Sequence, residues 1–270
     1  MCNILSISKA AYYKWLQRTT PVKEILDHQL CELIINYDQQ YKHILGYRRM
    51  TLFINHFNHQ HYSTNYIHRL MKYLGIKAKI RQARRGYHKS TPETVAANLL
   101  NREFNANQPN QKWLTDVTEF RVSSTSKKLY LSVIYDLYDR SVIAHKTSII
   151  NNNQLVFDTF KQAKKRFPDA QPLFHSDRGY QYTSRAFNHM LKSAGMTQSM
   201  SRVGRCIDNG PMEGFFGIIK SEMYYLNKFK DIASLVQRID EYIHFYNHQR
   251  LQINLKGLTP IAFRGQALTT

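Results

Sequence analysis

Three acidic side chains, each expected in a different kind of element, limit the folds that this sequence can adopt. Asp116 lies inside a run of residues typical of a β-strand, and Asp177 follows directly after a second, shorter run. Glu213 falls in the first turn of an expected helix, which Asn209 and Pro211 are suited to begin. Two neighbouring strands and a helix packed beside them can bring three such side chains to one point. The sequence therefore predicts a site of three carboxylates on an α/β fold.

The segments around these acids follow a definite order of strands and helices. Four runs rich in Val, Leu, Ile, Tyr or Phe predict strands: 112–121, 128–138, 141–147 and 172–175. Helices are expected to begin at Asn152 or Asn153, at Thr183 or Ser184, and at Asn209. A last helix has an apolar stripe that includes Leu235 and Tyr246. Three antiparallel strands, then a helix, a further strand and more helices, are the ribonuclease-H-like order.

The charge of the chain indicates a polyanionic partner. Lys and Arg number 38 against 19 Asp and Glu, which gives a formal net charge of +19. Nucleic acid would offset the resulting self-repulsion, and an anionic membrane surface is the second candidate. No apolar run approaches the roughly 20 residues of a membrane-spanning helix, and no signal peptide opens the sequence. We therefore expect a cytoplasmic protein that binds nucleic acid and no membrane.

The first third of the chain is helical in pattern and leads into a basic segment. Residues 4–18 look like a recognition helix, although a plain amphipathic helix fits them equally well. Residues 24–75 contain three apolar stripes at helical spacing, and Gly75 ends the last one. Residues 77–89 hold six basic residues and no acidic one. This composition predicts an arm along nucleic-acid phosphates or, alternatively, a solvated linker.

Longer motifs surround the three acids. They are Trp-Leu-Thr-Asp-Val-Thr-Glu-Phe at 113–120, His-Ser-Asp-Arg-Gly-Tyr-Gln-Tyr at 175–182 and Asp-Asn-Gly-Pro-Met-Glu-Gly-Phe-Phe at 208–216. With these motifs the chain resembles the integrase-type DDE transposases of bacterial insertion sequences, whose core is similar to that of retroviral integrases. It resembles the catalytic, second-frame product of the group in which the transposase is split across two reading frames. The resemblance covers nearly the whole chain and implies an α/β ribonuclease-H-like catalytic core preceded by an all-α helix-turn-helix region.

The resemblance also implies the chemistry. A transposase of this kind cleaves insertion-sequence ends and joins the 3′-hydroxyl to another DNA strand. Asp116, Asp177 and Glu213 would be catalytic and would bind two Mg²⁺ ions, with Mn²⁺ as an alternative. Asp116 would bridge both ions, and the other two acids would hold one each. Mg²⁺ prefers hard oxygen ligands and keeps several waters, so a few carboxylates suffice.

Other acids fit these roles less well. Glu119 is three residues from Asp116 on a strand and should face the opposite side. Glu222 is nine residues beyond Glu213, about 180° around a helix. Asp136 and Asp139 remain credible substitutes as metal ligands, although their positions are more typical of turn and edge residues.

Several residues are expected to contact DNA. Arg81, Arg84 and Arg85 belong to the basic segment, and Gln181 and Arg202 lie in motifs beside the acids. Lys220 comes seven residues after Glu213, so on a straight helix it lies near the same face, about 10 Å further along the axis. At that distance we expect Lys220 to bind a DNA phosphate or base; the alternative is a surface lysine.

These observations predict four parts: a helix-turn-helix-like DNA-binding region at 1–76, a basic linker at 77–110, the catalytic core at 111–230 and a C-terminal helix and tail at 231–270. The expected partners are double-stranded DNA, both terminal repeats and target, a homo-oligomer on DNA and the upstream-frame product. Two other functions stay open. One is a ribonuclease-H-like metal-dependent nuclease, and the other is a catalytically silent DNA-binding regulator, against which the three carboxylates argue.

Overall fold

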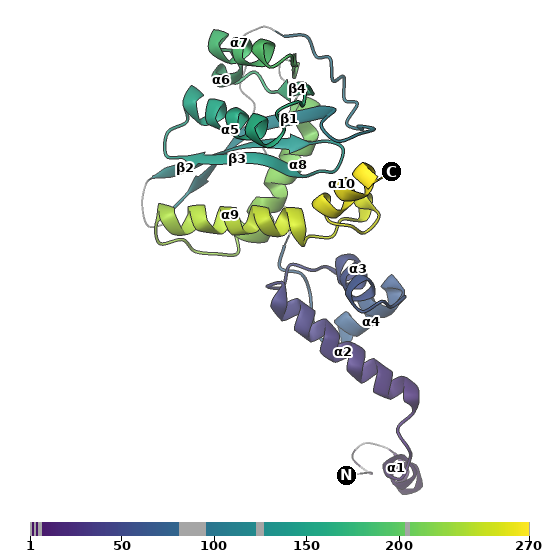
Figure 1. Ribbon diagram of the computed structural model, residues 1–270. Helices are drawn as coiled ribbons and strands as arrows, with labels where there is room; N and C mark the ends of the chain where they lie inside the picture. The colour runs from purple at the N-terminus through teal and green to yellow at the C-terminus, as the bar shows by residue number, and fades with distance from the viewer. Residues whose placement is uncertain are drawn as a thin grey trace. The chain divides into compact units, whose positions relative to one another are not determined.

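The computed structural model describes residues 2, 4, 7–80, 96–122, 127–202 and 206–269. The chain forms two compact units, Met1–Ala78 and Lys79–Thr270, shown from purple to yellow along the chain in Figure 1. Three predicted DNA contacts, Arg81, Arg84 and Arg85, lie outside the described residues.

The first unit is helical, as predicted. Its helices are α1 (Lys9–Leu16), α2 (Val22–Gln40), α3 (Tyr47–Phe57) and α4 (Thr64–Tyr73). Ser8 caps α1 and Ser63 caps α4, each by accepting a backbone N–H bond three residues on. Helices α2, α3 and α4 contact one another through buried apolar residues at helical spacing, among them Leu30, Phe53 and Ile67. No residue of α1 is buried.

The second unit is built on a mixed sheet. Its strands are β1 (Lys112–Arg121), β2 (Lys128–Asp136), β3 (Val142–Ser148), β4 (Leu173–Ser176) and β5 (Thr197–Met200), in the order β3-β2-β1-β4-β5. β1, β2 and β3 pair antiparallel, whereas β4 is parallel to both β1 and β5. The four predicted strands are confirmed within a few residues. β5 escaped prediction because its sequence, Thr-Gln-Ser-Met, has too few apolar residues to show alternation.

Helices cover both faces of this sheet (Figure 1). They are α5 (Asn153–Arg166), α6 (Tyr180–Thr183), α7 (Arg185–Ser193), α8 (Gly210–Ile219), α9 (Ile232–His248) and α10 (Pro260–Thr269), with short 3₁₀ turns at Cys206–Asn209 and Ile253–Leu255 and a π-helical segment at Lys220–Tyr224. Alternation along β1 separates the two cores. Leu114 belongs to the core with α8 and α9, and Trp113 belongs to the core with α5 and α7.

Within the described part of the chain, no helix has both the length and the apolar character needed to cross a membrane.

Candidate active site

Strand pairing brings the two aspartates together. β1 and β4 run in parallel with Leu114 opposite His175. Asp116 and Asp177 each come two residues later, so continuing the same register places them at neighbouring positions. Asp116 Oδ1 accepts the Val117 N–H (2.7 Å), and Asp177 Oδ1 accepts the Gly179 N–H (2.8 Å). Asp116 shares the parity of Leu114 and therefore lies on the sheet face that α8 covers.

The beginning of α8 is bound to β1 beside Asp116. Asn209, the residue before α8, donates from Nδ2 to the carbonyl oxygen of Thr115 (3.3 Å). Its side chain does not cap the helix, which corrects one detail of the predicted cap. Glu213 lies in the first turn of α8 and is exposed. The Asn209–Thr115 bond thus holds the helix that carries the third acid against the strand that carries the first.

The three carboxylates share one electrostatic environment. Burial, the charge of Asp177 and the charge of Glu213 raise the pKa of Asp116 well above its ordinary value, against the Val117 N–H and the charge of Lys220. Burial also raises the pKa of Asp177. Among the described residues, no three acids, histidines or cysteines lie close enough together to hold a metal ion as they stand. The donor set nevertheless suits a hard divalent cation, because it consists of carboxylate oxygens.

The chain after Asp177 is closely packed at Gly179, where any larger residue would crowd its neighbours. A Cβ on Gly179 would lie 3.0 Å from Asp177 Oδ1 and 3.0 Å from Gln181 Oε1. Gln181 is buried and donates from Nε2 to Asn151 Oδ1 (2.6 Å), and Tyr182 is buried with its hydroxyl 3.2 Å from Thr115 Oγ1. Gln181 therefore fixes this segment in the structure, and its contact with DNA stays a prediction.

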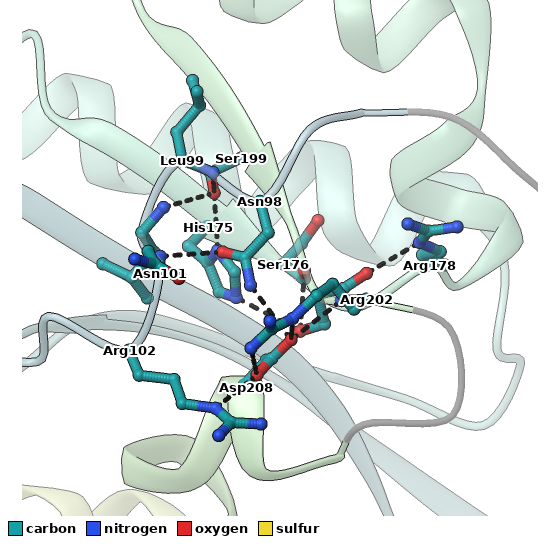
Figure 2. Close-up of polar contacts among 12 residues, drawn as sticks. Asn98, Leu99, Asn101, Arg102, His175, Ser176, Arg178, Ser199, Arg202 and Asp208 are labelled. Carbon is teal, nitrogen blue, oxygen red and sulfur yellow. Dashed lines mark hydrogen bonds and ion pairs between the residues drawn. The ribbon is translucent and has the colours of Figure 1, made fainter.

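His175 orders the ends of β4 and β5 (Figure 2). Ser199 Oγ accepts the N–H groups of Leu99 and Leu100 (both 3.0 Å), so its hydroxyl hydrogen is directed to His175 Nδ1 (2.9 Å). His175 Nε2 then donates to Ser201 Oγ (3.2 Å). Burial lowers the pKa of His175 to about 4, which keeps the ring neutral in this chain of bonds. The sequence motif contained His175 but did not reveal these partners.

Asp208 joins three parts of the second unit (Figure 2). It is fully buried and accepts bonds from Asn98 Nδ2 (3.0 Å), Arg102 Nε (2.8 Å) and Arg202 Nε (2.9 Å). The guanidinium groups, first of Arg202 and then of Arg102, hold the pKa of Asp208 well below its usual range. Sequence reasoning missed this role, because Asn98 and Arg102 lie more than 100 residues before Asp208. Arg202, predicted to contact DNA, is held by this carboxylate.

The remaining acids are engaged elsewhere. Glu119 bonds Lys128 Nζ (3.0 Å). Glu222 is buried and accepts bonds from Arg250 (2.9 Å) and Tyr242 (2.9 Å). Asp136 and Asp139 are buried and form ion pairs with Arg264, at 3.1 Å and 3.2 Å respectively. Asp136 is the last residue of β2 and Asp139 lies in the turn that follows, which agrees with the preference for a turn position over a metal role, and both are buried.

Lys220 marks a change in helix type. α8 ends at Ile219, and from Lys220 to Tyr224 the chain is π-helical, so the prediction of a straight helix is wrong beyond Ile219. Lys220 Nζ lies 5.5 Å from the centroid of the Phe120 ring. Its charge lowers the pKa of Asp116, so Lys220 acts within the electrostatic field of the carboxylates.

Comparison with known proteins assigns domain families to both units. Residues 106–206 and 213–268 match families described as integrase core domains, and residues 26–84 match an HTH-like domain. The InsK protein of insertion sequence element IS150 in Escherichia coli K12 is 43% identical over 82% of this chain and 77% of its own length. A transposase-like protein of Haemophilus influenzae is 41% identical over 82% of this chain and 97% of its own.

A third relative extends the likeness to both units. The transposase InsF of insertion sequence IS3A in Escherichia coli K12 is 30% identical over 99% of this chain and 94% of its own length. This level of identity extends over nearly the full length of both proteins. It therefore assigns the helical first unit and the sheet-containing second unit to the same family. The chain belongs to the integrase-core transposases of bacterial insertion sequences.

Proposed function

We propose that this transposase cleaves the DNA ends of an insertion sequence and joins the freed 3′-hydroxyl to a second DNA strand, with Asp116, Asp177 and Glu213 as its catalytic carboxylates. The observation that supports the proposal is that acids from the end of β4 and from the first turn of α8 both act on the pKa of Asp116 in β1. The relatives favour transposition over the nuclease alternative, because their names describe transposases. Double-stranded DNA is the proposed partner, bound by an oligomer of this chain.

The proposed cofactor is Mg²⁺, with Mn²⁺ as an alternative, held by the same three carboxylates. When bound, a pair of such cations activates the attacking oxygen and stabilises the leaving one. Asp116 would hold the cations together with Asp177 and Glu213, since the charges of both acids act on it. Phosphoryl transfer then requires from the protein mainly positioning and electrostatic stabilisation, and no covalent intermediate.

The chain's own residues meet that requirement in stated ways. The Val117 and Gly179 N–H groups fix the orientation of the two aspartates, and Asn209 fixes the helix of Glu213. Neutral His175 keeps the ends of β4 and β5 aligned without adding a positive charge that would compete with a cation for Asp177. The site is therefore rigid on the strands and presents Glu213 to solvent.

A strand-transfer assay tests the proposal. Purified protein would be incubated with an oligonucleotide that carries the insertion-sequence end, with and without Mg²⁺. Asp116→Asn, Asp177→Asn and Glu213→Gln should each reduce cleavage and joining by at least about 10³-fold while DNA binding persists. Glu119→Gln, which removes a neighbouring acid on β1, should retain activity. Turnover near that of the parent in any of the three variants would exclude that residue from the site.

A further inference from the structure

Three arginines at one end of the sheet are each held by their Nε atom. Arg102 Nε donates to Asp208 Oδ1 (2.8 Å), Arg202 Nε donates to Asp208 Oδ2 (2.9 Å), and Arg178 Nε donates to the carbonyl oxygen of Ser201 (2.7 Å). Figure 2 shows Arg102 and Arg202 directed to the buried Asp208, with Arg178 to one side of them. Binding at Nε fixes the plane of each guanidinium group.

Only one terminal nitrogen of these arginines bonds an acceptor in the described part of the chain. Arg202 Nη2 also bonds Asp208 Oδ1 (3.0 Å). Beyond that bond, no acceptor for the Nη atoms of Arg102, Arg178 or Arg202 is found among residues 96–122, 127–202 and 206–269. The side chains of Arg102 and Arg202 are 38% and 41% exposed, so water or a ligand can reach them.

Charge and shape indicate the chemistry of the ligand. Arg102 and Arg202 form ion pairs with the same carboxylate, Asp208, and Arg178 bonds a backbone carbonyl, so three positive groups face one negative group and the cluster is positive. The planar fork of an arginine matches two oxygens of a phosphate, and a guanidinium already fixed at Nε loses less entropy on binding. A phosphodiester therefore suits this cluster better than a neutral or cationic ligand.

The cluster lies next to the catalytic carboxylates. Arg178 follows Asp177 directly in the chain. The Ser201 N–H bonds the Ser176 carbonyl (3.0 Å), which brings Arg202 to the same end of the sheet. Asp208 precedes Asn209, whose side chain is bound to β1 beside Asp116. The three arginines therefore belong to the same end of the sheet as the carboxylates.

The backbone at Arg102 is held in an unfavourable conformation. Arg102 has φ of 63°, and Asn101 before it has φ of 43°. A non-glycine residue in this region costs conformational free energy, because its Cβ approaches the following carbonyl oxygen. The Asp208 bond to Arg102 and the Asn98 bond to the Asn101 N–H (2.9 Å) offset that cost and keep the Arg102 side chain directed to the cluster.

We infer that Arg178, together with Arg102 and Arg202, forms a binding site for a backbone phosphate of the DNA strand that is cleaved, close to the scissile bond. The inference rests on the proposed function for its ligand. It assigns direct phosphate binding to Arg178 and to the outward Nη atoms of the other two arginines, and it assigns to Asp208 the positioning of Arg102 and Arg202.

The test uses the full chain and end-containing oligonucleotides in which single phosphates near the cleavage site are replaced by neutral methylphosphonates. For the parent protein, one or two of these replacements should weaken binding about 5- to 20-fold. For Arg178→Ala, the same replacements should have no further effect, because that variant no longer binds the phosphate in question. The plot of log affinity against log salt should also become shallower, by about 0.9 in slope for each phosphate that is no longer neutralised. Arg178→Lys should regain part of the affinity, and Lys165→Ala, which removes an exposed charge on α5, should keep the parent's phosphate dependence.

The outcomes separate this inference from the proposed function. If Arg178→Ala responds to every methylphosphonate as the parent does, the phosphate site is excluded, even where the parent cleaves and joins DNA. If the parent binds ends but does not cleave them with Mg²⁺, the proposed function fails, and the phosphate site is still judged by binding alone. Circular dichroism of each variant tests whether its fold is retained. Should Arg178→Ala fail to fold, Arg178→Gln replaces it in the same comparison.

Discussion

At the scale of single residues, the site depends on close backbone approaches and on buried charges that are satisfied by bonds. Gly179 lets the chain turn beside Asp177, and Asp208 gathers Asn98, Arg102 and Arg202 around one carboxylate. Neither residue is expected to touch the reacting atoms. Replacing Gly179 should change the cleavage rate, and replacing Asp208 should change the stability, each through the neighbouring residues.

Gly179→Ala should slow cleavage about tenfold or more, because the new Cβ would lie 3.0 Å from Asp177 Oδ1 and displace the carboxylate. The change should leave the melting temperature close to that of the parent. Single-turnover cleavage with saturating Mg²⁺ is the measurement. Gly217→Ala is the matched control, since nothing lies within 4 Å of its Cβ position. Equal cleavage rates for Gly179→Ala and the parent would show that Asp177 tolerates the shift.

Asp208→Asn should lower the free energy of unfolding at pH 7 by about 1–3 kcal/mol, because the bonds from Arg102 and Arg202 lose their charged acceptor. The pKa of Asp208 is lower in the folded chain than its ordinary value of 3.8. Its stabilising contribution is therefore complete above that value and is lost as the pH falls further. Urea unfolding at pH 7, 5 and 3.5 should show the difference from the parent shrinking only at the lowest pH.

The exposed pair of Asp240 with His145 supplies the control for that measurement. Asp240→Asn should change the free energy of unfolding by less than about 1 kcal/mol, because the Asp240 side chain is 57% exposed. A difference for Asp208→Asn that stays constant from pH 7 to pH 3.5 would contradict the role assigned to the charge of Asp208.

At the scale of elements, the sequence predicted whatever has a strong local pattern. The strands around Asp116, the cap at Asn152 of α5 and the cap at Ser184 of α7 follow from alternation and from capping chemistry. β5 and the π-helical segment after Ile219 did not follow, because a short polar strand and an extra residue per turn depend on tertiary contacts. The bonds of Asp208 and His175 join segments far apart in sequence and have no local signal.

The π-helical segment begins at Lys220. The role predicted for Lys220 in DNA binding can be tested by substitution. Lys220→Ala should weaken binding of DNA ends and slow joining while the Mg²⁺ concentration required for activity stays unchanged. Lys220→Arg should keep part of both, because it retains the positive charge near Phe120 and Asp116. Single-turnover joining at saturating metal is the measurement. Lys228→Ala, which removes an exposed lysine beyond the segment, is the control; a Lys220→Ala variant that matches it would make Lys220 a surface residue.

At the scale of the whole molecule, a formal net charge of +19 fits a protein that works on DNA. The structure describes a helical unit and a sheet-containing unit, and the HTH-like match covers most of the first. Sequence alone predicted this succession because apolar periodicity changes from helical to alternating between residues 75 and 112.

Neutralising Arg81, Arg84 and Arg85 together should weaken DNA binding regardless of sequence. The slope of log affinity against log salt should become shallower by about 0.9 for each phosphate that the variant no longer neutralises. Fluorescence anisotropy with specific and random duplexes over a series of salt concentrations measures both effects. Weaker binding confined to the insertion-sequence end would instead indicate base recognition by these residues, and an unchanged slope would leave them a linker.

The parallel pairing of β1 with β4 also governs how such a protein can diverge. Asp116 and Asp177 meet because each lies two residues beyond a paired position, Leu114 and His175. An insertion of one residue between Leu114 and Asp116 would turn the carboxylate to the other face of the sheet. Insertions between β3 and α5, at the exposed Ile149 and Ile150, would leave that alignment intact. Diverged relatives should therefore vary freely in the distance between the two aspartates while keeping each aspartate at a fixed offset within its own strand.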